Sequence, residues 1–273
     1  MNVTLNGSVI PEEDQWLYDW FEVPAFNPSK VRNAIEANPA GETLVLEINS
    51  SGGSVFAGFE IYSVLREASC ETEAHVQSLA ASAASTLMLG CDRTLMSPVA
   101  QVMIHPPADG GGGNVHDHEQ SIKVLESITE SILNGYELRC HGKATREELA
   151  QMVDAETWLT AQRAVELGLA DGILYADSAE SSVLAAANVV NAIGGGIRAV
   201  ANSAVPMSAV DMRARYEQLV REGAKPADGH PVLGAGEKPD PKDQTPAPGN
   251  EPEPVCDDWQ RKARLAIENN RFL

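Results

Sequence analysis

The sequence has few basic residues: its 273 residues include 20 Lys and Arg against 39 Asp and Glu, a formal net charge of −19. Proteins that bind nucleic acid need basic patches to neutralise phosphates, so this balance argues against a nucleic-acid partner. Residues 1–178 hold most of the excess, with 9 basic against 26 acidic side chains, whereas residues 179–273 hold 11 against 13. We therefore expect the two parts of the chain to differ in structure.

Long apolar runs and paired cysteines are also missing. The longest apolar stretch, Leu79–Cys91, is interrupted by Ser82, Ser85 and Thr86 and is too short and polar for a membrane span, so no membrane partner is expected. The N-terminus lacks the basic and apolar regions of a secretory signal. The four cysteines are scattered without a C-x-x-C pair, which favours a reducing cytoplasm over a disulfide framework or a zinc site.

Cofactor motifs are absent as well. The sequence has no Walker A motif, and the glycines at 110–113 do not open a helix after a strand as a dinucleotide fingerprint would. His116 and His118 resemble a metal pair, but two residues apart on a helix they point away from each other. We therefore expect no metal and no organic cofactor.

Strand and helix patterns alternate along the first part. Thr43–Ile48 is an apolar run typical of a buried parallel strand, and Val55–Ala68 reads as a helix. Asn27 and Pro28 are typical of an N-cap and a first helical residue. This alternation predicts an α/β fold with a largely parallel sheet and flanking helices.

A long helical pattern covers Val115–Cys140. Its apolar side chains recur every three or four residues and form one stripe: Ile122, Leu125, Ile128, Ile132 and Tyr136. A compact domain cannot cover so long a stripe, so we expect this helix to project and to mediate self-association.

The C-terminal part, residues 179–273, differs from the first part in residue composition. Residues 179–223 predict a helical extension that includes a capped amphipathic helix at Ser208–Gly223. Residues 224–254 hold eight of the sixteen prolines and have little to bury, which predicts a disordered linker. Residues 255–273 read equally well as a short docking helix or as a tail.

Two junctions between a strand and a helix carry candidate chemistry. Gly52 and Gly53 follow the strand at Thr43–Ile48, where their amides could enter a cleft, although a tight turn explains them as well. Ser82 begins a helix, where the free amide of Ala83 favours negative charge, although most serines at such positions are caps. Taken singly, each pattern favours the structural explanation.

A histidine and two acids complete the candidates. His105 ends an apolar strand before two prolines and could act as a general base. Asp154 and Glu156 precede an aromatic residue, and either carboxylate could orient the histidine. In a chain this acidic, both carboxylates could equally be solvated surface groups.

In their order along the chain, these segments resemble the ClpP family of self-compartmentalising serine peptidases. The matching pieces are INSSGGSVFAGFEIYSVL, LAASAASTLML, VMIHPP and TWLTAQRAVELGLADGIL, all within residues 1–178. The resemblance implies a ClpP/crotonase-like parallel sheet with the long helix as a projecting handle, and a peptidase domain at residues 1–178.

The resemblance also implies roles for individual residues. It places the nucleophile at Ser82, the base at His105 and the oxyanion hole at Gly52, Gly53 and Ala83, with the amides of Gly52 and Ala83 as the donors. Ser78 and Ser85 are left as packing or capping residues. The family's acid is an Asp at the position held here by Glu156, which leaves Asp154 as the second candidate for that role. Two further departures are Ser51 in place of a proline before the glycines and Ala84 in place of a glycine.

The function that follows is a serine endopeptidase without a cofactor, assembled as a homo-oligomeric ring or double ring. The segment DAETWLTA and the long Pro-rich extension resemble the phage head-maturation (prohead) proteases, which implies cleavage of capsid or scaffold proteins in the host cytoplasm or the assembling prohead. A second hypothesis is a Clp proteolytic subunit that works with a separate AAA+ unfoldase. A third is an inactive scaffold-like assembly protein, and a fourth is a crotonase-like enzyme, which would not need Ser82 and His105 in register.

Overall fold

A computed structural model describes residues 1–175 and 208–230. The chain divides into two compact units at about residue 206, and each is described by itself. The predicted extension at 179–223 lies only partly within the described residues. The predicted linker at 224–254 lies mostly outside them, and the predicted tail at 255–273 lies wholly outside.

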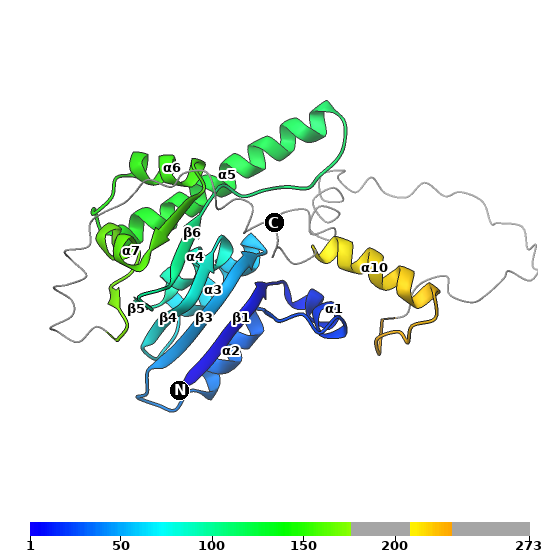
Figure 1. The fold of residues 1–273 in the computed structure, drawn as a ribbon, viewed down its shortest axis with the longest axis horizontal. Helices are drawn as coiled ribbons and strands as arrows, with labels where there is room; N and C mark the ends of the chain where they lie inside the picture. Colours follow the sequence, from blue (N-terminus) through cyan, green and yellow to red (C-terminus); the bar gives the residue numbers. More distant parts are fainter. Residues whose placement is uncertain (176–207, 231–273) are drawn as a thin grey trace, which may run out of the picture. The chain divides into compact units, whose positions relative to one another are not determined.

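The first unit is built on a mostly parallel sheet, in which the described residues contribute eight strands (Figure 1). The strand order is β2-β1-β3-β4-β5-β8, while β6 pairs with the second half of β4 and β7 runs antiparallel to β6. The strands are β1 (Asn2–Val9), β2 (Ala25–Phe26), β3 (Leu44–Gly53), β4 (Thr72–Ala81), β5 (Arg93–Met96), β6 (Gln101–Ile104), β7 (Thr157–Thr160) and β8 (Gly172–Ile173). The predicted α/β class with a parallel sheet is confirmed.

Helices connect most of the parallel strands, as right-handed crossovers require. In the first unit these are α1 (Gln15–Trp20), α2 (Pro28–Ala37), α3 (Val55–Arg66), α4 (Ala83–Leu87), α5 (Val115–Cys140), α6 (Arg146–Asp154) and α7 (Ala161–Leu167), with short 3-10 turns at Glu12–Asp14 and Met88–Gly90. The predicted start of α2 is confirmed: Asn27 accepts a hydrogen bond from the amide of Lys30 at 3.0 Å, and Pro28 is the first helical residue.

The central strand β3 shows that the chain covers only one face of the sheet well. Leu44, Leu46 and Ile48 are fully buried, whereas Val45 and Glu47 between them are partly exposed. The run at Thr43–Ile48 is therefore a one-sided strand, although its continuous apolar letters are typical of burial on both faces.

The handle helix α5 has the bounds that the sequence predicts, but its two halves differ in burial. Ile128, Ile132 and Tyr136 in the second half are buried. Val115 and Ile122 in the first half are 70% and 55% exposed. Figure 1 shows that this first half extends away from the sheet, so the predicted projection is confirmed.

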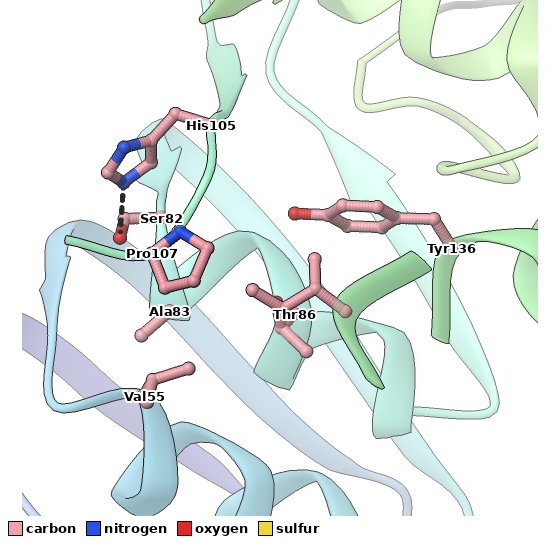
Figure 2. Close-up of a pocket in the computed structure, with 8 residues that line it drawn as sticks. Val55, Ser82, Ala83, Thr86, His105, Pro107 and Tyr136 are labelled. Atoms are coloured by element: carbon pink, nitrogen blue, oxygen red, sulfur yellow. Dashed lines mark hydrogen bonds between the residues drawn. The ribbon is translucent and has the colours of Figure 1, made fainter. Parts of the chain in front are cut away.

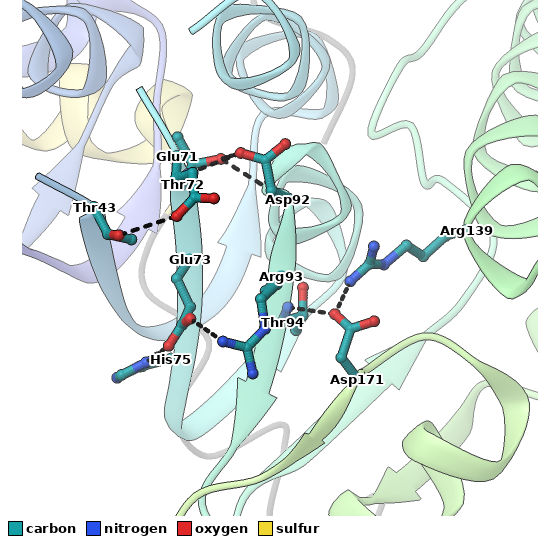
Figure 3. Close-up of polar contacts among 10 residues, drawn as sticks. All are labelled: Thr43, Glu71, Thr72, Glu73, His75, Asp92, Arg93, Thr94, Arg139 and Asp171. Carbon is teal, nitrogen blue, oxygen red and sulfur yellow. Dashed lines mark hydrogen bonds and ion pairs between the residues drawn. The ribbon is translucent and has the colours of Figure 1, made fainter. Parts of the chain in front are cut away.

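Polar contacts at the edge of the sheet fasten α5 to the strands (Figure 3). Asp171, just before β8, accepts a hydrogen bond from the amide of Thr94 in β5 at 2.7 Å and forms an ion pair with Arg139 of α5. On the neighbouring strand, Glu73 accepts hydrogen bonds from His75 and Arg93. The Asp171–Arg139 ion pair thus holds the buried half of α5 against the edge of the sheet, whereas the contacts of Glu73 join β4 to β5.

The second unit is represented by α10 (Ala209–Arg221), which agrees with the helix predicted at Ser208–Gly223. Its N-cap is Ser208, and the hydroxyl of Tyr216 donates to the carbonyl of His230 at 2.6 Å. Among residues 1–175 and 208–230, no helix combines the length and the apolar character that a membrane span requires.

Candidate active site

Ser82 occupies a strained junction between β4 and α4. Its backbone φ is +54°, in a region that residues other than glycine rarely adopt, and its amide donates to the carbonyl of Met103 in β6 at 2.9 Å. Although Ser82 is the N-cap residue of α4, its side chain makes no capping hydrogen bond. The interpretation of Ser82 as a capping side chain is therefore wrong, and strain of this kind is typical of functional positions.

The side chain of Ser82 instead meets His105. The Oγ of Ser82 and the Nε2 of His105 are 2.8 Å apart, which is hydrogen-bond distance (Figure 2). β4 and β6 are parallel neighbours with Ala81 opposite Met103, so both strands deliver the residues beyond their carboxyl ends to the same edge of the sheet. The resemblance to the ClpP family implies that the side chains of Ser82 and His105 lie together, and the structure brings them together.

The environment of His105 favours the neutral imidazole. Burial lowers the pKa of His105 from its usual value, and the negative charge of Glu156 partly opposes this shift. A neutral imidazole can accept the proton of the Ser82 hydroxyl, whereas an imidazolium cannot. The lowered pKa thus keeps the histidine in the form that a general base needs at neutral pH.

The strand register distinguishes the two acids that the sequence offers. β6 and β7 are antiparallel with Ile104 opposite Thr157, so the next positions outward are His105 and Glu156. Asp154 lies instead at the end of α6. Both carboxylates are exposed, and Glu156 has a φ of +51°. Within the described residues no hydrogen bond joins Glu156 to His105, and their interaction is electrostatic.

The glycine pair lies beside Ser82, but its two members face different elements. Gly52 has a φ of +96°, and a Cβ added to it would lie 2.5 Å from the Cβ of Ser82. A Cβ on Gly53 would instead lie 2.2 Å from the carbonyl oxygen of Val9 in β1. The amide of Gly52 donates to the Oγ of Ser50 at 3.1 Å. The first amide of an α-helix, here that of Ala83 in α4, has no acceptor within the helix.

The other two serines of the segment have structural partners. Ser78 lies within β4 and donates to the side chain of Asn49 at 2.9 Å, so it does not cap a helix. Ser85 is fully buried and donates to the carbonyl of Ser82 at 2.6 Å. That carbonyl lies three residues back along the chain.

A small cavity adjoins Ser82 and His105 (Figure 2). Its volume is about 10 Å³, room for roughly one water molecule. The remaining lining residues are mostly apolar: Val55, Ala83, Thr86, Pro107, Ile132 and Tyr136. Two of them, Ile132 and Tyr136, come from α5, so the handle helix forms one wall of the site.

Several of these contacts were not predicted from the sequence. Tyr136 and Ile132 were assigned only to the apolar stripe of α5, and Ser50 was not singled out. The signal that could have drawn attention to Tyr136 is its hydroxyl group, because a buried tyrosine in an otherwise apolar stripe needs a hydrogen-bond partner. As for metals, no cluster of three or more His, Cys, Asp or Glu that could bind an ion occurs in the part of the chain that the structure describes.

A largely parallel α/β unit with a long helix inserted between β6 and β7 is a ClpP-like fold. The profile of the family described as Clp protease matches residues 33–177. The sequence is 34% identical over 145 residues to the ATP-dependent Clp protease proteolytic subunit 1 of Chlamydia abortus. This alignment covers 52% of this chain and 74% of that protein. It is 30% identical over 146 residues to the proteolytic subunit 2 of Corynebacterium diphtheriae, covering 51% and 70%.

The chain therefore belongs to the Clp protease family, and the resemblance seen in the sequence is confirmed. It is a ClpP-like peptidase. The matched segment contains Ser82, His105 and Glu156, whereas residues 1–32 and 178–273 lie outside it.

Proposed function

We propose that this protein is a serine endopeptidase in which Ser82 is the nucleophile and His105 is the general base. His105 takes the proton of Ser82 as the hydroxyl attacks a peptide carbonyl, and it then gives that proton to the departing amine. Water, activated by the same imidazole, hydrolyses the acyl-enzyme. The observation that carries this proposal is the 2.8 Å contact between the Oγ of Ser82 and the Nε2 of His105.

Glu156 is the acid of the proposed triad. Its charge raises the pKa of His105 against the effect of burial, so it stabilises the imidazolium that forms during attack. The β6–β7 register supports Glu156 over Asp154. Ile104 pairs with Thr157, so the next residue beyond each strand end places Glu156 opposite His105.

Backbone amides bind the oxyanion in this proposal. Ala83 supplies the first amide of α4, and Gly52 supplies a second when it exchanges its hydrogen bond with Ser50 for one with the oxyanion. Gly53 keeps the chain against Val9 and so supports the turn that carries Gly52. The cavity beside Ser82 receives the side chain that precedes the scissile bond.

The test is labelling of the full-length protein with a fluorophosphonate probe. We expect one probe per chain, attached to Ser82. Ser82→Ala abolishes labelling, whereas Ser85→Ala, which removes another hydroxyl of the same segment, is still labelled when the reaction is followed to its end point. An assembled wild-type protein that takes up no probe would contradict the proposal and favour the inactive scaffold-like assembly protein.

The assembly is proposed to be a ring or double ring of identical chains. The exposed apolar side chains on the first half of α5 support this, because a second copy of the helix would cover them. The related proteolytic subunits are named as ATP-dependent, which supports protein substrates and the second hypothesis, in which a separate AAA+ unfoldase is the partner.

The biological setting is proposed to be phage head maturation, with residues 1–178 as the peptidase unit. The support is the Pro-rich extension beyond the matched residues 33–177, which could carry the enzyme into an assembling shell. Incubation with a candidate capsid or scaffold protein, with and without an ATPase, distinguishes the settings. Cleavage without the ATPase supports the prohead protease, and cleavage only with it supports the unfoldase-dependent subunit. A fragment of residues 1–178 that cleaves peptides would show that the extension is dispensable for the chemistry.

A further inference from the structure

A chain of buried hydroxyl groups connects the handle helix to the backbone of Ser82. Tyr136 of α5 is 1% exposed, and its hydroxyl lies 2.7 Å from the Oγ of Ser85. The Oγ of Ser85 lies 2.6 Å from the carbonyl oxygen of Ser82. Figure 2 shows the ring of Tyr136 with its hydroxyl directed toward α4 and the pocket.

The direction of these hydrogen bonds follows from their chemistry. A carbonyl oxygen only accepts, so Ser85 must donate its single hydroxyl proton to Ser82. The hydroxyl of Tyr136 is therefore the donor to Ser85. Burial raises the pKa of Tyr136, so its proton stays in place throughout the working pH range.

The carbonyl that receives this chain belongs to the same peptide group as the amide of Ala83. Carbonyl and amide point in opposite directions across a planar trans peptide, so a group that fixes the carbonyl of Ser82 also aims the amide of Ala83. On the other side of Ser82, its own amide is fixed by Met103. The carbonyl of Ser82 also accepts a hydrogen bond from the backbone amide of Ser85 at 2.9 Å, so the hydroxyl of Ser85 is its second donor. Together these contacts hold Ser82 at its φ of +54°.

We propose that Ser85 and Tyr136 are positioning residues of the active site, which orient the Ser82–Ala83 peptide and thereby the oxyanion-binding amide and the nucleophile. This proposal rests on the proposed function of Ser82. A merely structural role, in which Ser85 bonds to its own helix and Tyr136 fills the core, would change stability without a specific effect on kcat.

The experiment compares variants of the full-length protein by peptide hydrolysis, by the rate of fluorophosphonate labelling and by thermal stability. We expect Ser85→Ala to lower kcat and the labelling rate about tenfold, because one buried hydrogen bond is lost, while KM changes by less than about twofold. Tyr136→Phe leaves the bond from Ser85 to Ser82 and lowers both rates about threefold. The double variant is no slower than Ser85→Ala alone, because both changes act through one chain. The midpoint of the pH profile stays in place, since neither hydroxyl titrates there.

Thr94→Val is the matched control. The hydroxyl of Thr94 is also fully buried and donates to a backbone carbonyl, that of Met88, at 3.2 Å, but it has no contact with Ser82. We expect Thr94→Val to lower the melting temperature as Ser85→Ala does and to keep the wild-type kcat.

The inference is overturned if Ser85→Ala and Tyr136→Phe react at wild-type rates, or if Thr94→Val loses as much kcat as they do. In both cases the proposed function stands, because wild-type labelling at Ser82 is measured in the same series. If Ser85→Ala fails to fold, the rates of Tyr136→Phe decide whether the inference holds, since this variant keeps the aromatic side chain in the core. Absence of labelling in the wild-type protein overturns the proposed function first and this inference with it.

Discussion

Gly52 and Ser82 lie so close together that a Cβ on Gly52 would come within 2.5 Å of the Cβ of Ser82 and within 2.7 Å of the carbonyl oxygen of Ala81. Contacts this short force the backbone to move, and a displacement of about 1 Å in an active site costs roughly a hundredfold in rate. We predict that Gly52→Ala lowers kcat for peptide hydrolysis by about that factor.

Gly41→Ala is the control that separates the steric clash of an added Cβ from the backbone strain of a positive φ. Gly41 has a φ of +82°, close to that of Gly52, but a Cβ there would meet nothing within 4 Å. Both variants therefore carry the cost of a positive φ, about 1 kcal/mol, and only Gly52→Ala displaces Ser82. Equal activity of the two variants would show that the close approach does not matter for catalysis.

The pH dependence of kcat/KM should report the environment of His105. Since burial lowers its pKa, activity should rise through a midpoint below 6.5, the value usual for histidine. Because the charge of Glu156 raises this pKa, Glu156→Gln should move the midpoint to lower pH and reduce the plateau about tenfold or more. Asp154→Asn is the control and should change neither. A shift caused by Asp154→Asn and not by Glu156→Gln would reverse the assignment of the acid.

The cavity beside Ser82 should restrict which residue can precede the cleaved bond. Its volume of about 10 Å³ admits only a small side chain, so we predict faster cleavage after Ala than after Leu. Ile132→Ala enlarges the cavity and should raise the Leu-to-Ala ratio of kcat/KM at least tenfold, the effect of about one methylene in an apolar pocket. Ile128→Ala removes an equally buried side chain one turn earlier on α5 that does not line the cavity. If both variants change the ratio equally, the cavity is not the specificity pocket.

The exposed half of α5 should mediate assembly. Ile122 is 55% exposed, and we predict that Ile122→Asp converts the proposed ring to smaller species, measured by sedimentation velocity. Ser127→Asp introduces the same charge at an exposed polar position of the helix and should leave the assembly intact. Dissociation by both variants would indicate a general effect of charge on this acidic chain.

The order of the local patterns along the chain, and the family resemblance that this order carries, placed the candidate nucleophile and base, although each pattern alone favoured a structural explanation. The junctions at Ser82 and His105 were visible because β-strands, prolines and helix starts leave strong local signals. The bounds of α5, Val115–Cys140, agree with its apolar periodicity for the same reason. Parallel strands align their carboxyl ends, and this alignment of β4 and β6 is the physical reason why the two residues meet.

Other features depend on contacts between distant segments, which no local pattern carries. The choice between Asp154 and Glu156 depends on the antiparallel register of β7 against β6. The hydrogen bond between Ser85 and Tyr136 joins residues 51 positions apart. The partial exposure of Val45 and Glu47 depends on what covers the second face of the sheet, and the letters of β3 do not reveal it.

The pairing of β6 with β7 has a consequence for how this protein can vary through evolution. His105 and Glu156 are brought together by four paired positions on short neighbouring strands, from Gln101 with Thr160 to Ile104 with Thr157. The first half of α5 and the glycine-rich loop before it contribute nothing to that pairing. Insertions and deletions in this segment can therefore accumulate in related chains without moving the two ends apart, whereas a one-residue slip in either strand would separate them.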